Sequence, residues 1–64
     1  MPVIRISGPA NVSKETKKEL IEKTSKIVAD SYGLPIQTIT VIIDETPSDN
    51  VGVAGEQLSE RMNK

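Results

Sequence analysis

The chain has 64 residues, a formal net charge of −1 at pH 7 and one aromatic residue, and it contains neither cysteine nor histidine. Disulfides are excluded, and carboxylates are the main metal ligands left, so we expect no metal site. The balanced charge and the absence of stacking aromatic residues argue against nucleic-acid binding. With no apolar run near the ~18 residues of a membrane span and no signal region, we expect a cytoplasmic protein.

The amino terminus runs from Met1 and Pro2 directly into a β-branched segment, residues 3–7, whose partial alternation predicts a strand. A small second residue lets an aminopeptidase remove Met1, which would leave Pro2 with a free secondary amine. An α-amine titrates near ~7.7–8.0 when unperturbed, so modest desolvation or a nearby cation would make it a base at neutral pH. If Met1 stays attached, the Pro2 nitrogen is a non-basic amide. Many chains also begin Met-Pro without any catalytic meaning.

A long helix follows the breaker segment 8–11. Three-to-four spacing of apolar residues predicts a helix from Lys14 to Tyr32, with Ser13 as its N-cap. Gly33 supplies a left-handed C-cap and Pro35 forbids continuation. We expect one stripe to face the core, made of Leu20, Ile21, Thr24, Ile27, Val28 and Ser31.

The second half of the chain holds another predicted strand and an arm. Residues 39–43 are almost continuously apolar and β-branched, which is typical of a strand covered on both faces. Residues 44–50 read as a polar loop, and 51–55 as a small hairpin or an arm that docks on a neighbour. Gly52 and Gly55 would serve the backbone of that arm. Residues 56–64 have the composition of a terminal helical turn.

The element order predicts a single α+β domain, 1–64, with a β-α-β arrangement and a short C-terminal hairpin or arm. A helical crossover implies a parallel strand pair with a right-handed connection. Two strands and one helix make no stable core and leave both sheet edges open. Chains of about 60 residues usually need disulfides, a metal or oligomerisation. We therefore expect the sheet to be completed by oligomerisation.

Four motifs together carry a family resemblance. They are the Met-Pro start, the Ser-capped "ETKKELIEKTSKIVADSYGLP", the run "TITVIIDET" and the late "NVGVAGE". Each is weak alone, but their order, spacing and total length resemble the 4-oxalocrotonate tautomerase family, in particular its short DmpI-type members. The resemblance covers nearly the whole chain. It implies a subunit that dimerises into a four-stranded sheet with two helices on one face, and a homohexamer built as a trimer of dimers.

The resemblance also implies an activity. Pro2, freed of Met1, would be the general base that takes a proton from a small 2-hydroxy-dienoate or 2-oxo acid, such as 2-hydroxymuconate, and returns it at another carbon. No cofactor or metal would take part. Such a base must lie within hydrogen-bond reach of the proton and titrate near the working pH.

Three positions depart from the family pattern. An arginine before the helix binds the substrate carboxylate in well-known members, and Val12 stands there instead. A second arginine in the second strand is Thr40 here, and a phenylalanine that walls the site is Val51. Losing charge-assisted donors should weaken carboxylate binding and stabilisation of the enolate oxygen. The implied isomerase would therefore be weak.

Arg5 and Arg61 are the arginines that remain. Each is a candidate for substrate binding, with ordinary surface solvation as the alternative. Arg5 has the opposite strand parity to Pro2, so it would reach a site from a neighbouring subunit. Thr40 could offer a weaker hydrogen bond to a substrate oxygen, or its methyl group could simply pack.

Two other functions compete with tautomerisation. The same fold and base could hydrate or dehalogenate a small unsaturated acid. Alternatively, the chain could be a non-catalytic oligomeric scaffold or small-molecule binding protein. The retained Pro2 favours an enzyme, whereas the lost arginine positions favour the scaffold.

Overall fold

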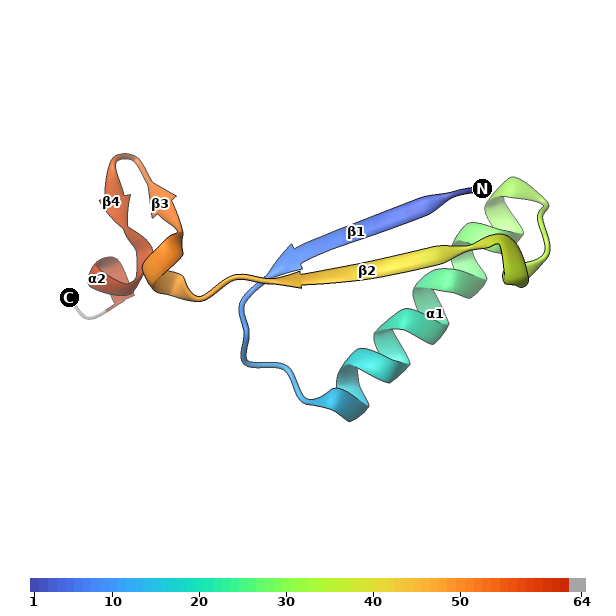
Figure 1. The fold of residues 1–64 in the computed structure, drawn as a ribbon, viewed down its shortest axis with the longest axis horizontal. Coiled ribbons are helices and arrows are strands. Elements are labelled where there is room, and N and C mark those ends of the chain that lie inside the picture. The colour runs from blue at the N-terminus through green and yellow to red at the C-terminus, as the bar shows by residue number, and fades with distance from the viewer. Residues whose placement is uncertain (63–64) are drawn as a thin grey trace.

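The structure is a computed structural model that describes residues 1–62 and forms the expected β-α-β arrangement (Figure 1). The two longer strands and the helix between them make the body, and a small C-terminal arm projects from its far end. The elements are β1 (Val3–Gly8), α1 (Lys14–Tyr32), η1 (Ile36–Thr38), β2 (Thr40–Glu45), η2 (Ser48–Asn50), β3 (Gly52–Val53), β4 (Glu56–Gln57) and α2 (Leu58–Met62).

β1 and β2 pair in parallel, as the helical crossover predicts. The register runs from Val3 opposite Thr40 to Gly8 opposite Glu45. The second strand is longer than expected at its far end, because the predicted loop 44–50 begins two residues too early. Asp44 and Glu45 are polar, yet they continue the pairing with the last two residues of β1, and both carboxylates are held in ion pairs.

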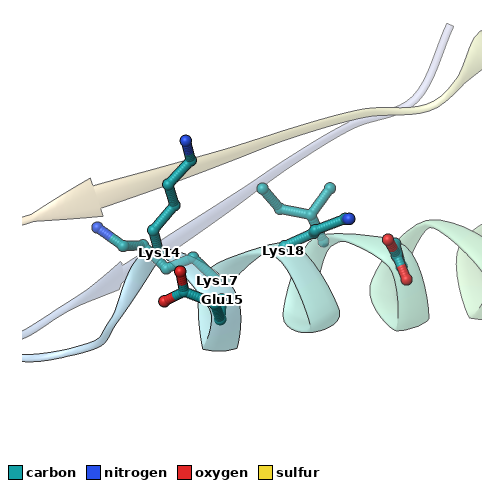
Figure 2. Close-up of a pocket in the computed structure, with 6 residues that line it drawn as sticks. Lys14, Glu15, Lys17 and Lys18 are labelled. Carbon is teal, nitrogen blue, oxygen red and sulfur yellow. The ribbon is translucent and has the colours of Figure 1, made fainter.

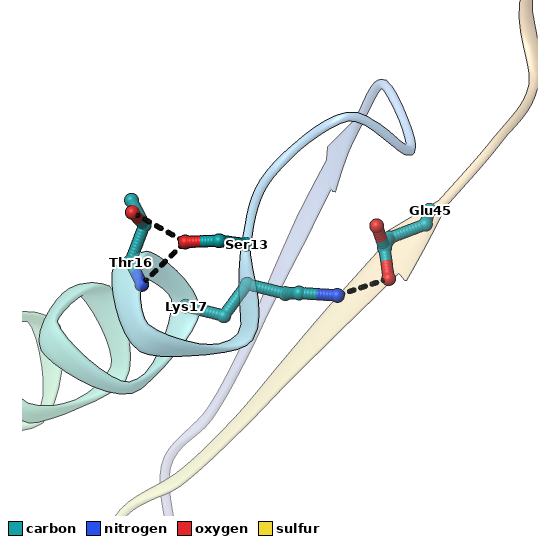
Figure 3. A network of polar contacts seen from close by, with 4 residues as sticks. All are labelled: Ser13, Thr16, Lys17 and Glu45. Carbon is teal, nitrogen blue, oxygen red and sulfur yellow. Dashed lines mark hydrogen bonds and ion pairs between the residues drawn. The ribbon is translucent and has the colours of Figure 1, made fainter.

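The two faces of this sheet differ in their cover. Along β1 the even-numbered residues are half-buried and the odd-numbered residues are exposed. An ion pair from Lys17 on α1 to Glu45 places Glu45 on the helix side (Figure 3). Because side chains alternate along a strand and paired residues share a side, the other face carries the odd residues of β1 and the even residues of β2. This open face comprises Val3, Arg5, Ser7, Thr40, Ile42 and Asp44.

Both predicted ends of α1 are confirmed. The Ser13 hydroxyl oxygen accepts a hydrogen bond from the Thr16 N–H at 3.1 Å and donates one to the Thr16 hydroxyl at 2.9 Å (Figure 3). Thr16 thus takes the place at which Glu or Gln would close a capping box. At the other end Gly33 has φ 65, and the Leu34 N–H donates to the Ala29 carbonyl at 3.0 Å.

Removing the Ser13 cap should cost about 1 kcal/mol of stability. Ser13→Ala leaves the first-turn N–H groups without their side-chain acceptor, whereas Ser13→Asp keeps one. Urea unfolding followed by circular dichroism, at one fixed protein concentration, checks this. Equal midpoints for the two variants would contradict the capping role.

The predicted core stripe of α1 is only partly covered by the sheet: Thr24 and Val28 are half-buried, whereas its other members are exposed. The residues most buried against the sheet are Ser25 and Ala29, at 9% and 6% exposed, and neither belongs to the predicted stripe. Leu20 and Ile27 belong to it but are exposed, Ile27 at 66%. A two-stranded sheet covers only a narrow strip of helix, and the small Ser25 and Ala29 side chains permit the closest approach.

The core of the single chain is therefore thin. Among the described residues, Ala29 and Ser25 alone are classed as buried. Large apolar side chains remain exposed on β1, on α1 and after the helix, among them Val3, Ile27 and Ile36. A 64-residue chain with so little buried has no core of its own comparable to that of a stable small domain.

The C-terminal arm folds back on itself rather than on the β1–β2 sheet. β3 and β4 pair antiparallel around a two-residue turn in which Ala54 has φ 55 and Gly55 φ 79, as in a type I′ hairpin. Gly55 thus has the expected backbone role. Gly52 does not, because a Cβ there would meet its nearest atom at an ordinary 3.9 Å. Positions 63–64 of the predicted terminal turn lie outside the described residues. Within 1–62, no helix has the length and apolarity to cross a bilayer.

Candidate active site

Pro2 stands immediately before β1, at the edge of the sheet. Its carbonyl accepts a hydrogen bond from the Thr40 N–H at 3.1 Å, which extends the β1–β2 ladder by one step. A proline is tolerated at this end because it has no N–H to contribute to the ladder. The Pro2 backbone is therefore held by the sheet while its nitrogen lies at the sheet's end.

A hollow of about 390 Å³ lies around this residue and is called the Pro2 hollow below. It forms where the crossover returns the end of α1 to the start of β1, next to the chain's N-terminus (Figure 1). Apart from the hydroxyl of Tyr32, its side chains are apolar. The lining residues are Met1, Pro2, Val3, Ile4, Val28, Tyr32 and Leu34.

Two predicted site residues, Thr40 and Arg5, lie near Pro2 in the sheet but point elsewhere. Thr40 pairs with Val3 on the open face, so its N–H, rather than its side chain, contacts Pro2. Arg5 is also on the open face, where its guanidinium lies 3.4 Å from the Asp44 carboxylate and its side chain is 64% exposed. Neither residue lines the Pro2 hollow of its own subunit.

The other three predicted site residues lie beyond the opposite end of the sheet. Val12 directly precedes the N-cap of α1, and Val51 lines a separate hollow together with residues 7–9. Arg61 is on α2, with its Nε 3.8 Å from the Glu56 carboxylate. From Pro2 to Gly8 an extended chain covers roughly 20 Å. One subunit therefore cannot gather these residues around its own Pro2.

A larger hollow, of about 710 Å³, lies along the first two turns of α1, far from Pro2. It contains Lys14, Lys17 and Lys18, but their ammonium groups point in different directions (Figure 2). Lys17 is also paired with Glu45. The lysines do not converge on one point, so size alone does not make this hollow a binding site. Within residues 1–62, no group of three metal-ligating side chains is gathered.

Tyr32 is the residue of the Pro2 hollow that sequence reasoning missed. As a lone aromatic at the end of a helix, it shows no motif. The signal was topological: in a β-α-β unit with a parallel strand pair, the helix must return its last turn to the start of the first strand. Residue 32 could therefore have been placed beside residue 2 before any coordinates were known.

Known proteins match the chain over nearly its whole length. Residues 2–61 match the family model described as "Tautomerase enzyme". "Probable tautomerase K2" of Dickeya dadantii (strain 3937) is 42% identical over 62 residues, which are 95% of this chain and 92% of that protein. A "2-hydroxymuconate tautomerase" of Pseudomonas fluorescens is 34% identical over 59 residues, 92% and 94% of the two chains.

Solved structures share the fold. TomN, a 4-oxalocrotonate tautomerase homologue in the tomaymycin biosynthetic pathway, superposes with a TM-score of 0.92 at 27% identity, over 98% of this chain and 97% of that one. A heterohexamer 4-oxalocrotonate tautomerase from Chloroflexus aurantiacus J-10-fl gives 0.85 at 30% identity, over 94% and 97%. The family model, the relatives and the shared β-α-β path agree, and the chain belongs to the tautomerase family.

Proposed function

We propose that this protein is an isomerase that uses the amine of Pro2, freed by removal of Met1, as the general base on a small 2-hydroxy-dienoate or 2-oxo acid such as 2-hydroxymuconate. The observation that carries the proposal is the position of Pro2, held by the sheet at the edge of an apolar hollow. The Pseudomonas fluorescens relative, a 2-hydroxymuconate tautomerase by name, supports the substrate class.

The chemistry is a proton relay by one amine. The neutral Pro2 nitrogen takes the proton of the substrate's 2-hydroxyl group, electrons shift along the diene, and the ammonium returns the proton to a chain carbon, which gives the conjugated ketone. The side chains of Ile4, Val28 and Leu34 give the hollow beside Pro2 an apolar lining. The ring of Pro2 holds the nitrogen lone pair in one direction, unlike a lysine on its flexible stem.

The active assembly in this proposal is a homo-oligomer, a hexamer built as a trimer of dimers. Two features of the subunit support this. Its core is thin, and Val12, Val51 and Arg61 lie roughly a strand's length from Pro2. A neighbouring copy is what would bring such residues to a Pro2 hollow. The heterohexamer assembly of the Chloroflexus aurantiacus protein supports the number six.

The proposed enzyme has Val12 and Thr40 where the resemblance implies arginines, so it should bind a substrate carboxylate more weakly. Arg5 and Arg61 are candidates to replace them across a subunit boundary. Arg5 lies 3.4 Å from the Asp44 carboxylate, and Arg61 lies 3.8 Å from the Glu56 carboxylate. A substrate carboxylate would have to compete with these acidic partners. Both pairs lie at the surface, where such pairs contribute little, so exchanging the acidic partner for a substrate carboxylate would gain little affinity.

The test is ketonisation of 2-hydroxymuconate, followed in the ultraviolet, for the Met1-free protein and its Pro2→Ala variant. We expect the variant to lose at least about tenfold in kcat/KM, because its primary amine is still basic but no longer held by a ring. Pro35→Ala, which changes an exposed proline that lines neither the Pro2 hollow nor the hollow at Val51, is the matched control and should keep its rate. An unchanged rate in Pro2→Ala would overturn the proposal.

The loss of both arginine positions favours a second candidate, an oligomeric binding or scaffold protein without catalysis. This candidate needs no free Pro2 amine. Intact mass spectrometry of the native protein separates the two, because Met1 found attached to most of the molecules would exclude Pro2 chemistry and leave the scaffold.

A further inference from the structure

We infer that the hydroxyl of Tyr32 binds the substrate beside Pro2, by donating a hydrogen bond to an oxygen of the substrate carboxylate. The inference rests on the proposed function and adds to it a residue from the same subunit. Pro2 and Tyr32 line one hollow although 30 positions separate them in the chain. A residue that shares this hollow needs no neighbouring copy to reach the substrate.

Tyr32 carries the one polar side-chain group among the residues that line the Pro2 hollow. Any hydrogen bond that this lining offers to a substrate through a side chain must therefore come from its hydroxyl. A hydrogen bond to an ionised acceptor is stronger than one between neutral groups. Besides the Pro2 amine itself, the Tyr32 hydroxyl is the side-chain donor that a carboxylate in this hollow would meet.

The hydroxyl is also available. Tyr32 is 67% exposed, and within residues 1–62 its hydroxyl makes no hydrogen bond with the protein. The last turn of α1 that carries it is fixed by the Gly33 cap and the packing of Ala29 on the sheet. The ring therefore starts from a rigid backbone and has only two side-chain torsions to settle, which keeps the entropy cost of positioning it low.

A tyrosine binds a carboxylate more weakly than an arginine would. It gives one donor and no charge, whereas a guanidinium presents a fork of donors to both carboxylate oxygens. One such donor suits a carboxylate next to the reacting carbon, which a 2-hydroxy or 2-oxo acid has whether or not it carries a second carboxylate. The expected substrate class is thus a small 2-hydroxy or 2-oxo acid.

Tyr32→Phe is the deciding variant because it removes the hydroxyl and keeps the ring. We expect kcat/KM for 2-hydroxymuconate to fall about 10- to 100-fold, mainly through KM, as for loss of a hydrogen bond to a charged group. The inhibition constant of fumarate, an unreactive dicarboxylate, should rise by a similar factor. The mass of the assembly and the pH profile of the rate should stay unchanged, since neither the ring nor Pro2 is altered.

A purely structural Tyr32 would behave differently. If only its ring matters, Tyr32→Phe would match the parent within twofold in both constants while Tyr32→Leu loses assembly or activity, and the inference would be overturned. Loss of activity in Pro2→Ala with full activity in Tyr32→Phe would sink this inference alone. Full activity in Pro2→Ala would instead sink the proposed function.

Tyrosine fluorescence gives a readout that does not depend on turnover. Tyr32 is the one aromatic residue of the chain, so the intrinsic emission of the protein reports directly on the Pro2 hollow. Adding fumarate to the Met1-free protein should change this emission with a midpoint equal to the inhibition constant. Unchanged emission at saturating fumarate would mean that the ligand does not reach Tyr32, and the inference would fail.

Discussion

A chain that keeps Met1 should ketonise 2-hydroxymuconate no faster than buffer, whereas the same chain beginning at Pro2 should be active. In the first chain the Pro2 nitrogen is an amide, whose lone pair is delocalised into the carbonyl and does not take up a proton near neutral pH. General-base catalysis typically contributes 10²–10⁴-fold, so we expect at least about a 100-fold difference in kcat/KM. Chains 1–64 and 2–64 are short enough for chemical synthesis, which fixes the terminus without relying on processing.

The control is chain 2–64 with its Pro2 nitrogen acetylated. It lacks Met1 but also lacks the amine, so it should be as inactive as chain 1–64. Activity in the acetylated chain would mean that Met1 blocks the hollow by its bulk, and equal activity in all three chains would rule out Pro2 as the base.

The pH dependence of the active chain follows from the same amine. The base works in its neutral form, so the rate should rise as pH increases through the pKa of the Pro2 amine and level off above it. The acetylated chain has no amine to protonate, so it should show no such rise.

The ends of α1 could be predicted from single residues because each end is decided locally. Ser13 supplies an acceptor to its own first turn, and Gly33 adopts a left-handed conformation that most residues avoid. The orientation of the helix about its axis could not be predicted in this way. It depends on how much of the helix a two-stranded sheet covers. The small residues Ser25 and Ala29 pack closest to the sheet, although larger apolar residues lie nearby on the helix.

The residues of the candidate site also fall into those that the sequence predicts and those that it does not. Pro2 could be proposed from its place in the chain, since only an N-terminal proline offers a secondary amine. Tyr32 could not be found from pattern, because its closeness to Pro2 is a property of the crossover. Val12 and Val51 lie at the other end of the sheet, so any contact of theirs with a Pro2 hollow would depend on how copies assemble, which the order of residues along one chain does not specify.

Placing a charge on the open face of the sheet should destroy both assembly and fold. Ile42 is half-buried on this face and pairs with Arg5 across the strands. If a second copy covers the face, Ile42→Asp puts a carboxylate into the contact, at a cost of at least about 3 kcal/mol. A separated copy could not absorb that loss, because Ala29 and Ser25 are the only residues classed as buried within its described part.

The expected result for Ile42→Asp is a monomeric mass in sedimentation together with loss of the helical circular dichroism signal at 25 °C. Asn11→Asp makes the same change of charge in an exposed loop residue and should keep both mass and signal. The parent protein should melt at a higher temperature when it is more concentrated, because association stabilises the folded form by mass action. A folded, monomeric Ile42→Asp chain would show that the β-α-β unit is stable alone. An unchanged oligomer would show that the open face is not the contact, and would direct attention to the exposed flank of α1 at Leu20 and Ile27.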